Sequence, residues 1–245
     1  MLPETYYVGV YWGPRRETAA ECAHRAARFF HALEDCDLSF SKWYRASHGR
    51  PTRGQPGLLL PTGNLQEFEA FLLSGRNRTD TDHQVIEELG FSGFVWNGRK
   101  NCAHLSLHCG GYSPYNPNVC VMSLPSEGEI FERMVNTPVL TRVLACMVTA
   151  WEPDWGVATS HPLREHVSTP NSEALFAGWL TWFSRRRGTV PPLPAPARIE
   201  PLGAEGTLVT LCPERPTAKN PEHLAGISRI HPLLDRAGLL RPLAS

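Results

Sequence analysis

One amphipathic segment near the start of the chain limits the possible folds more than any other feature. Between Glu17 and Leu33 small and apolar residues recur at helical spacing, while charged residues occupy the opposite face. A helix with a single apolar stripe must bury that stripe against another layer. The preceding stretch, Tyr6 to Trp12, is rich in aromatic and β-branched residues and ends at Gly13-Pro14, which is typical of a strand. We therefore expect this helix to lie on a β-sheet.

Further strand patterns favour hairpins. Phe91 to Trp96 and Ala103 to Cys109 are joined around Asn97-Gly98, a dipeptide that is common in tight hairpin turns. The same reasoning predicts strands at Asp37 to Tyr44, Asn118 to Leu124, Gly178 to Ser184 and Thr207 to Leu211.

Capping residues mark the other helices. Asn64 is the expected N-cap of a helix that ends at Gly75, and a short helical piece, Val85 to Leu89, stops at Gly90. The other two helices are a buried one, Val139 to Trp151, opened by Thr137-Pro138, and a last one opened by Asn220-Pro221, interrupted at Pro232 and closed by Gly238.

These elements are interspersed without strict β-α-β alternation, and hairpin signals dominate. The pattern favours an α+β fold with a mostly antiparallel sheet packed on one side by helices. His48 to Gly63 is expected to be an exposed loop, and the proline-rich stretch 190–201 an extended crossing segment. Because the strand and helix of 207–238 are too short to form an independent core, we predict one compact domain over 1–245.

Composition excludes several classes of protein. The chain has 24 basic and 24 acidic residues, whereas a nucleic-acid binder that works by bulk electrostatics should show a basic excess. An apolar fraction of 42% excludes wholesale disorder. The N-terminus has no secretory pattern, the longest apolar run is too short to span a bilayer, and the seven cysteines are odd in number and scattered. We expect a cytoplasmic protein with reduced thiols and without membrane contact.

Two stretches suggest chemistry. In the first, Cys102, His104 and His108 share one face of a strand and Cys120 lies on a neighbouring strand, so the four could bind zinc in a metal-stabilised binding module. The spacing matches no specific zinc motif, and an ordinary alternating strand explains the pattern more simply.

In the second, Glu152 and Asp154 lie between Trp151 and Trp155 and could serve as general acid and base in a small hydrolase. The simpler interpretation is a helix end that turns at Pro153, with packed tryptophans and solvated carboxylates. The chain has no nucleophile elbow and no glycine-rich phosphate loop.

Acidic residues gather at Asp80, Asp82, Glu87 and Glu88. A negative surface would complement a basic partner and speed its capture. An ordinary solvated helix face, balanced by Arg76 and Arg78, is an equally good interpretation of the same residues.

Several short blocks, in order along nearly the whole chain, resemble the immunity protein 52 family. They include the strand YYVGVYWG at 6–13, the segment VIEELGFS at 85–92, WNG at 96–98, WEPDWGV at 151–157, GWLT at 178–181 and NPEH at 220–223. The resemblance implies a protein of bacterial polymorphic toxin systems that binds a toxin delivered by a sibling cell, often through a type VI secretion system.

The resemblance also implies that the partner is a nuclease of restriction-endonuclease-like fold, and that the chain has no catalytic residues and no cofactor. A nuclease inhibitor needs a rigid scaffold, aromatic anchors and charges that complement a DNA-binding cleft. We therefore expect a non-enzymatic immunity protein whose toxin contacts include Asp80, Asp82, Glu87 and Glu88.

Overall fold

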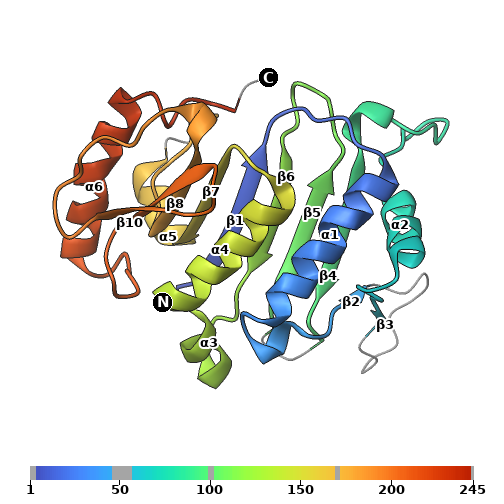
Figure 1. Cartoon of the computed structure of the whole chain (residues 1–245), viewed down its shortest axis with the longest axis horizontal. Coiled ribbons are helices and arrows are strands. Elements are labelled where there is room, and N and C mark those ends of the chain that lie inside the picture. The colour runs from blue at the N-terminus through green and yellow to red at the C-terminus, as the bar shows by residue number, and fades with distance from the viewer. Residues whose placement is uncertain (1–3, 46–56, 99–101, 169–171, 244–245) are drawn as a thin grey trace.

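A single sheet organises the whole chain in the computed structural model, which describes residues 4–45, 57–98, 102–168 and 172–243. Its ten strands are all antiparallel to their neighbours and follow the order β3-β2-β4-β5-β6-β1-β7-β8-β10-β9 (Figure 1). The strands are β1 (Tyr6–Trp12), β2 (Tyr44–Arg45), β3 (Leu58–Leu59), β4 (Phe91–Trp96), β5 (His104–Cys109), β6 (Asn118–Ser123), β7 (Trp155–Ser160), β8 (Leu180–Ser184), β9 (Arg198–Pro201) and β10 (Gly206–Thr210). The predicted α+β fold with an antiparallel sheet is confirmed.

Three helices cover one face of the sheet: α1 (Ala19–Glu34), α2 (Leu65–Ser74) and α4 (Thr137–Trp151) (Figure 1). The amphipathic helix α1 begins at the N-cap Thr18, whose side chain forms a reciprocal capping box with Glu21. Its apolar stripe is buried, as the sequence predicted, and α4 lies beside it, with Trp151 stacked on Trp12 of β1 at a ring distance of 5.4 Å. These contacts form the main core.

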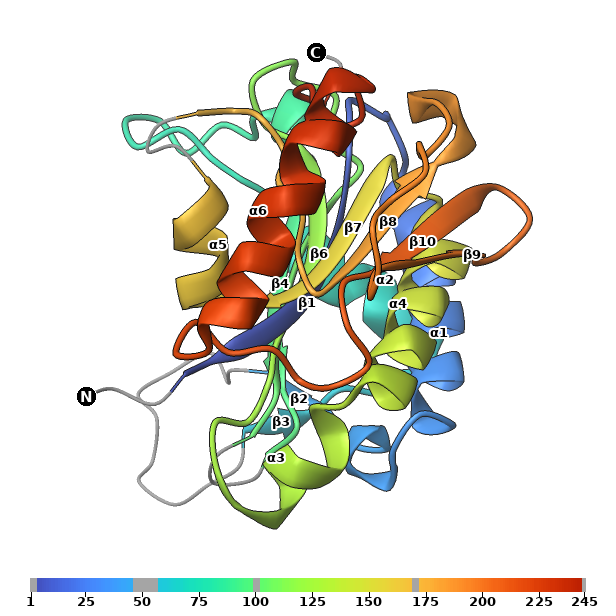
Figure 2. The ribbon, with the colours of Figure 1, turned by 90° about the vertical axis from the view of Figure 1, so that its left-hand side faces the viewer.

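On the opposite face, the helices among the described residues cover only one half of the sheet. The helices α5 (His161–Val167) and α6 (Pro221–Arg236) pack together across the end of the sheet that holds β7 and β8 (Figure 2). The ring of His161 lies 4.9 Å from that of Tyr7 on β1, which ties α5 to the central strand. Helices therefore lie on both faces, and the expectation of helices on one side alone is wrong.

Several predicted elements are corrected by the structure. Asp37 to Tyr44 is not a strand: it holds the 3-10 turn Leu38–Phe40 and only the first residue of β2. The helix α4 begins at Thr137, two residues before the predicted Val139, and its N-cap is Asn136 and not Thr137. The last helix is not interrupted at Pro232, because this residue lies on the exposed side while Ile230 and Leu234 hold the helix to the core.

The remaining expectations concern short stretches of the chain. The short helical piece before Gly90 is a 3-10 turn, Glu87–Leu89. The proposed loop from His48 lies largely outside the described residues, which resume at Gly57. No local pattern predicted β7, α5 or the short helix α3 (Gly128–Met134).

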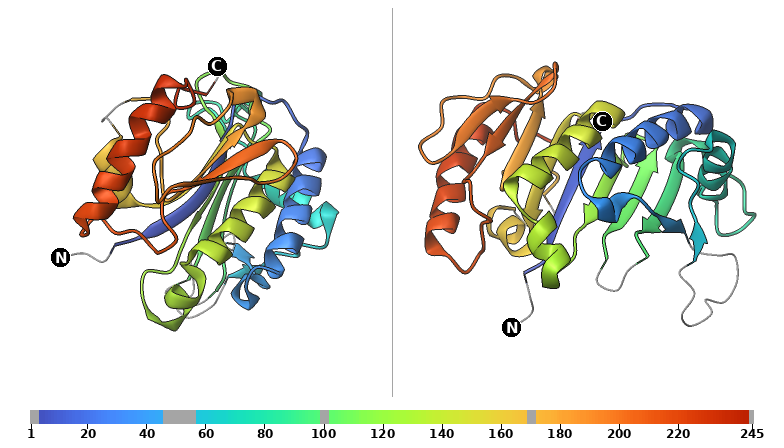
Figure 3. Two further views of the ribbon diagram at one scale, coloured as in Figure 1. Left: turned by 60° about the vertical axis from the view of Figure 1, so that its left-hand side comes forward. Right: turned by 60° about the horizontal axis from the view of Figure 1, so that its bottom comes forward.

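The proline-rich stretch 190–201 ends in β9, which pairs with β10 at one edge of the sheet. Because β10 also pairs with β8, the C-terminal part of the chain extends the same sheet. The two further views of Figure 3 show this C-terminal layer continuing from the strongly twisted sheet.

Candidate functional site

The open half of the sheet is the surface formed by β4, β5 and β6 on the face away from α1. Burial alternates strictly along β5, where Leu105 and Leu107 are buried toward the helices while His104 and Ser106 are exposed. No helix among the described residues covers this side of the three strands (Figures 1 and 2). A sheet face without a covering layer is available to a partner.

An aromatic cluster occupies the open half. Phe94 is 51% exposed, and its ring lies 5.8 Å from that of His104, stacked at 20°, and 6.2 Å from that of Trp96. Strand register extends this group sideways, because Trp96 pairs with Tyr44 of β2 and Tyr44 with the exposed Leu59 of β3. Clustered aromatic side chains of this kind are typical anchors of protein interfaces.

The open half carries no formal charge, since β4, β5 and β6 contain no Asp, Glu, Lys or Arg. Its polar groups are serine hydroxyls and two imidazoles. His108 Nδ1 lies 3.2 Å from the hydroxyl of Ser92, and burial lowers the pKa of His108 below its ordinary value of 6.5. An uncharged surface can be covered by a partner without the cost of desolvating ions.

A hollow borders the open half where α5 begins. Its volume is about 550 Å³, and its lining includes His104 and Ser123 from the sheet and His161 from α5. The hollow therefore lies where the covered half meets the open half, next to His104 of the aromatic cluster. This arrangement can seat a protruding segment of another protein.

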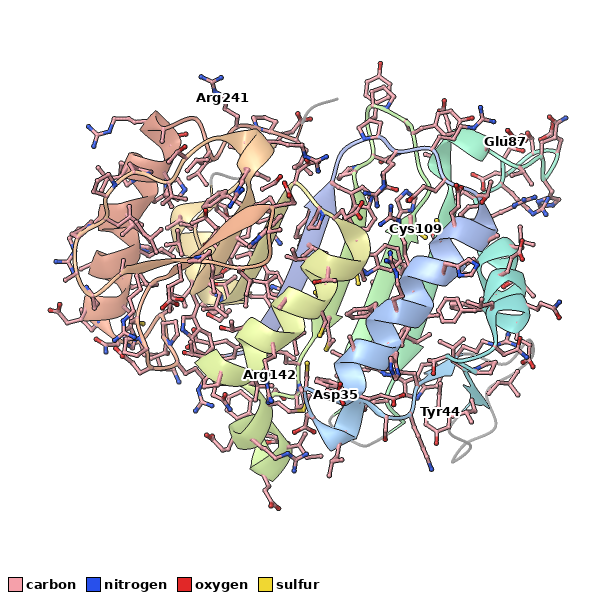
Figure 4. The ribbon with its side chains drawn as sticks, in the orientation of Figure 1. Asp35, Tyr44, Glu87, Cys109, Arg142 and Arg241 are labelled. Carbon is pink, nitrogen blue, oxygen red and sulfur yellow. The ribbon has the colours of Figure 1, made fainter. Side chains whose placement is uncertain are left out.

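The four predicted acidic contacts lie at one corner of the molecule, in the segment that leads from α2 to β4. Asp80, Asp82, Glu87 and Glu88 are all exposed, and Glu87 is labelled at this corner in Figure 4. Asp82 accepts hydrogen bonds from the hydroxyl of Thr79 and the backbone N–H of Gln84, which lower its pKa.

Arginines are interspersed with these carboxylates. Arg16 lies 3.8 Å from Glu87, and the guanidinium of Arg78 donates to the carbonyl of His83. The corner is therefore a mixed surface with a small acidic excess. Its role as a toxin contact stays a prediction.

The two carboxylates of the hydrolase alternative line one cavity of about 640 Å³. Each is held by an arginine: Glu152 lies 3.3 Å from Arg25, and Asp154 lies 3.2 Å from Arg186 and also accepts from the backbone N–H of Gly13 at 3.0 Å. These contacts fix the turn between α4 and β7, in which Glu152 adopts a left-handed conformation. The arrangement is that of a structural corner.

The two neighbouring tryptophans do not form the walls of this cavity. Trp151 packs under α4 against Trp12, and Trp155 lies on the opposite face of the sheet, 5.0 Å from the ring of Tyr11. The predicted placement of the two carboxylates beside the two indoles is therefore wrong, because the turn at 152–154 separates Trp151, on the helix side of the sheet, from Trp155 on the other face.

The zinc alternative is also wrong. His104 and His108 share the open face, but Cys120 pairs with Leu107 and is buried on the helix side, next to Trp151. Cys102 Sγ lies 3.8 Å from His104 Nε2, but the sheet separates the Cys120 thiol from both imidazoles, so the four predicted ligands do not come together.

A different trio, Cys212, Glu214 and His223, does gather within 4.8 Å. His223 Nδ1 accepts a hydrogen bond from the backbone N–H of Thr217 at 3.0 Å, so in neutral histidine the proton sits on Nε2, which lies 3.3 Å from Glu214. A metal-binding histidine would instead donate its second N–H to an acceptor. The trio is a hydrogen-bonded corner that fixes the start of α6.

Within the described part of the chain, no single helix is long and apolar enough to cross a membrane. The consecutive helices α3 and α4 reach that length only together, and they are bent by 71° relative to each other. Most of the apolar residues of α4 are buried against the sheet.

Comparison with known proteins identifies a family and similar solved structures. The model of a family described as immunity protein 52 matches residues 4–243. A solved structure of a T6SS protein from Pseudomonas aeruginosa is similar at a TM-score of 0.52 and 16% identity, covering 91% of this chain and 73% of that chain. No curated protein sequence matches the chain. At this identity the structural likeness establishes a shared fold.

Proposed function

The chain belongs to the immunity protein 52 family, and from this premise we propose that it binds and neutralises a cognate secreted nuclease toxin through the open half of its sheet. In this proposal it acts in the cytoplasm, without catalysis or cofactor, and protects the producing cell from its own or a sibling's toxin. The toxin is a nuclease of restriction-endonuclease-like fold, delivered by a type VI secretion system. The shared fold with a T6SS protein supports this context.

The observation that carries the proposed surface is the exposed aromatic cluster of Phe94, Trp96 and His104 on an uncharged sheet face. Interface energy concentrates in a few aromatic anchors that become fully desolvated. The hollow beside α5 gives the same surface a concave part. The acidic corner around Asp82 and Glu87 lies outside the cluster, where it would steer a basic nuclease toward the interface.

The first test is co-expression with the toxin encoded by the neighbouring gene in a sensitive bacterium, followed by purification through a tag on the toxin. The proposal expects rescue of growth together with stoichiometric co-purification. A toxin that kills regardless and does not bind would refute the immunity function for this pair. DNA cleavage by the toxin alone, abolished by the purified chain, would test the nuclease assignment separately.

A matched pair of substitutions tests the surface. Phe94→Asp places a charge in the aromatic cluster, whereas Leu38→Asp changes an 87% exposed leucine in the turn after α1. Loss of an interface anchor should weaken toxin binding by about 30-fold or more, equivalent to about 2 kcal/mol, and the Leu38 variant should bind like the unaltered protein. Equal binding by both variants would place the interface elsewhere and leave the immunity function standing.

A further inference from the structure

Two thiols meet where the end of α1 approaches α4. Cys36 follows α1 and Cys146 lies on α4, and their Sγ atoms are 3.5 Å apart. Both sulfurs also approach the carbonyl oxygen of Ala32, Cys36 Sγ at 3.8 Å and Cys146 Sγ at 3.5 Å. The pair is separated by 110 positions in sequence, so only the packing of the two helices brings it together.

The surroundings of the two thiols are unequal. Cys146 is half-buried, whereas Cys36 is 5% exposed. The guanidinium of Arg142, one helical turn before Cys146, donates to the carbonyl oxygen of Cys36 at 3.0 Å. Figure 4 shows Arg142 and Asp35 at this end of the two helices.

The two groups also differ in acidity. The hydrogen bond with Cys36 and, to a smaller extent, the positive charge of Arg142 lower the pKa of Cys146, against the opposing effects of burial and Asp35. The same hydrogen bond and burial raise the pKa of Cys36. A thiolate that a neighbour stabilises reacts first with an oxidant, and a thiol in contact with it can then resolve the product.

We propose that Cys36 and Cys146 form a reversible disulfide that links the end of α1 to α4 under a peroxide oxidant. The Cys146 thiolate attacks hydrogen peroxide, breaks the O–O bond and becomes a sulfenic acid, with hydroxide as the leaving group. The Cys36 sulfur then attacks the sulfenic sulfur, the S–O bond breaks and a second hydroxide leaves. The two thiol protons convert these hydroxides to water, so two thiols and one peroxide give one disulfide and two waters.

The link would act on the helix layer alone. Cys36 directly follows α1 and Cys146 lies within α4, and these two helices cover the face opposite the open half of the sheet. A bond that closes so long a loop restricts the unfolded chain strongly. Oxidation therefore stabilises the scaffold and leaves the toxin-binding surface unchanged. The proposal does not depend on the identity of the toxin.

A second thiol pair provides an internal comparison. Cys22 of α1 and Cys109 of β5 also interact, but both are fully buried between helix and sheet. Peroxide cannot reach either sulfur without unfolding the protein. Accessibility of one partner distinguishes the reactive pair from this inert one.

The experiment treats the purified full-length protein with hydrogen peroxide, blocks free thiols with a maleimide and maps tryptic peptides by mass spectrometry. We expect one cross-link between peptides 29–42 and 143–164, which contain Cys36 and Cys146 as their only cysteines. Reductant should reverse it, and the oxidised protein should melt about 5–15 °C higher than the reduced one.

Four variants test the proposal and its specificity. Cys36→Ser and Cys146→Ser should each abolish the cross-link and the rise in Tm, while Cys102→Ser should preserve both. Arg142→Gln should slow the reaction at neutral pH without changing the fold, as judged by circular dichroism. Over-oxidation of Cys146 without a cross-link, or a cross-link between Cys22 and Cys109 in its place, would overturn the proposal.

Discussion

The two halves belong to one continuous sheet and differ in what covers their second face, the face away from α1 and α4. In β7 and β8 every residue is buried, because α4 covers one side and α5, α6 and the segment around Phe176 cover the other. In β5 burial alternates, because only the helix side is covered. The fold therefore covers both faces of the β7–β8 half and leaves an aromatic surface exposed on the other half.

The two halves differ in burial at equivalent positions of the same sheet face. One lateral row on the second face makes the difference visible: register connects Ser106 to Val121, Gly9, Val157 and Thr181 in turn across five strands. Ser106 is exposed at the start of the row, and Thr181 is fully buried near its other end. Positions in one row of the same sheet face thus range from exposed to fully buried.

The largest expected contrast comes from placing the same charge at both ends of this row. Thr181→Arg buries a cation without a partner and removes the hydroxyl that accepts from the backbone N–H of Gly178, so it should cost about 4 kcal/mol or more. Ser106→Arg should change stability by less than about 0.5 kcal/mol. Urea denaturation of both variants measures the contrast, and similar losses would show that the open half is covered in solution.

Removal of an aromatic ring from each half gives a smaller contrast. Trp155→Ala deletes a buried indole that contacts Tyr11 and Phe176 and should cost about 3–5 kcal/mol. Phe94→Ala should cost less than about 1 kcal/mol, because half of this ring is already in water. Thermal unfolding compares the two. A large loss at Phe94 would assign the cluster a structural role.

Charge reversal at the acidic corner should affect the rate of association and leave the rate of dissociation nearly unchanged. Replacing Asp80, Asp82, Glu87 and Glu88 by Lys should slow toxin binding about 10-fold at low salt, because steering depends on the facing surface. Stopped-flow measurements at increasing ionic strength should show the difference shrinking. A matched control reverses four exposed carboxylates of the covered half, Glu200, Glu205, Glu222 and Asp235. If this control slows association as much as the corner variant or more, the acidic corner is excluded as the steering surface.

The smallest effect concerns His108 in the open half. Burial lowers the pKa of His108 in the folded protein, so the unfolded chain binds a proton more readily as the pH falls below about 6.5. Its contribution to stability is present above that pH and decreases on acidification toward the folded pKa. His108→Gln should therefore flatten the decrease in unfolding free energy between pH 7 and 5 by on the order of 1 kcal/mol or less.

The matched control for this measurement is His104→Gln, which changes an exposed imidazole on the same strand and the same face. His231 of α6 has a pKa that burial also lowers, so part of the pH dependence should persist in the His108 variant. If the unfolding free energy of the His108→Gln variant depends on pH as strongly as that of the unaltered protein, the assignment of this pH dependence to His108 is refuted.

Local sequence patterns predicted most elements for a clear reason. In α1 the apolar spacing, the capping residues and the final burial all agree, and the turn signal at Asn97-Gly98 corresponds to a hairpin in which Gly98 has φ of +74°. A side chain at Gly98 would also collide with the ring of Tyr44. Where local signals conflicted with tertiary packing, as at Pro232, packing prevailed.

The candidate site was harder to predict. Alternation along HLSLHC in β5 already indicated one polar face, and Phe94 falls on that same face by register. Aromatic residues on an otherwise polar face were therefore a usable signal. The strand β7 escaped prediction because WGVATS is short, contains glycine and follows a helix end.

The sequence by itself determined the class of fold, the order of most elements, and membership in a family through blocks spread along the chain. Local propensity, capping and alternation act over a few residues, so they can be recognised in the amino-acid sequence alone. Only the tertiary structure decided which half of the sheet stays open, that Cys120 turns away from His104, and that Cys36 meets Cys146. Those facts depend on strand register and helix placement between residues far apart in the chain, and no local pattern encodes such distances.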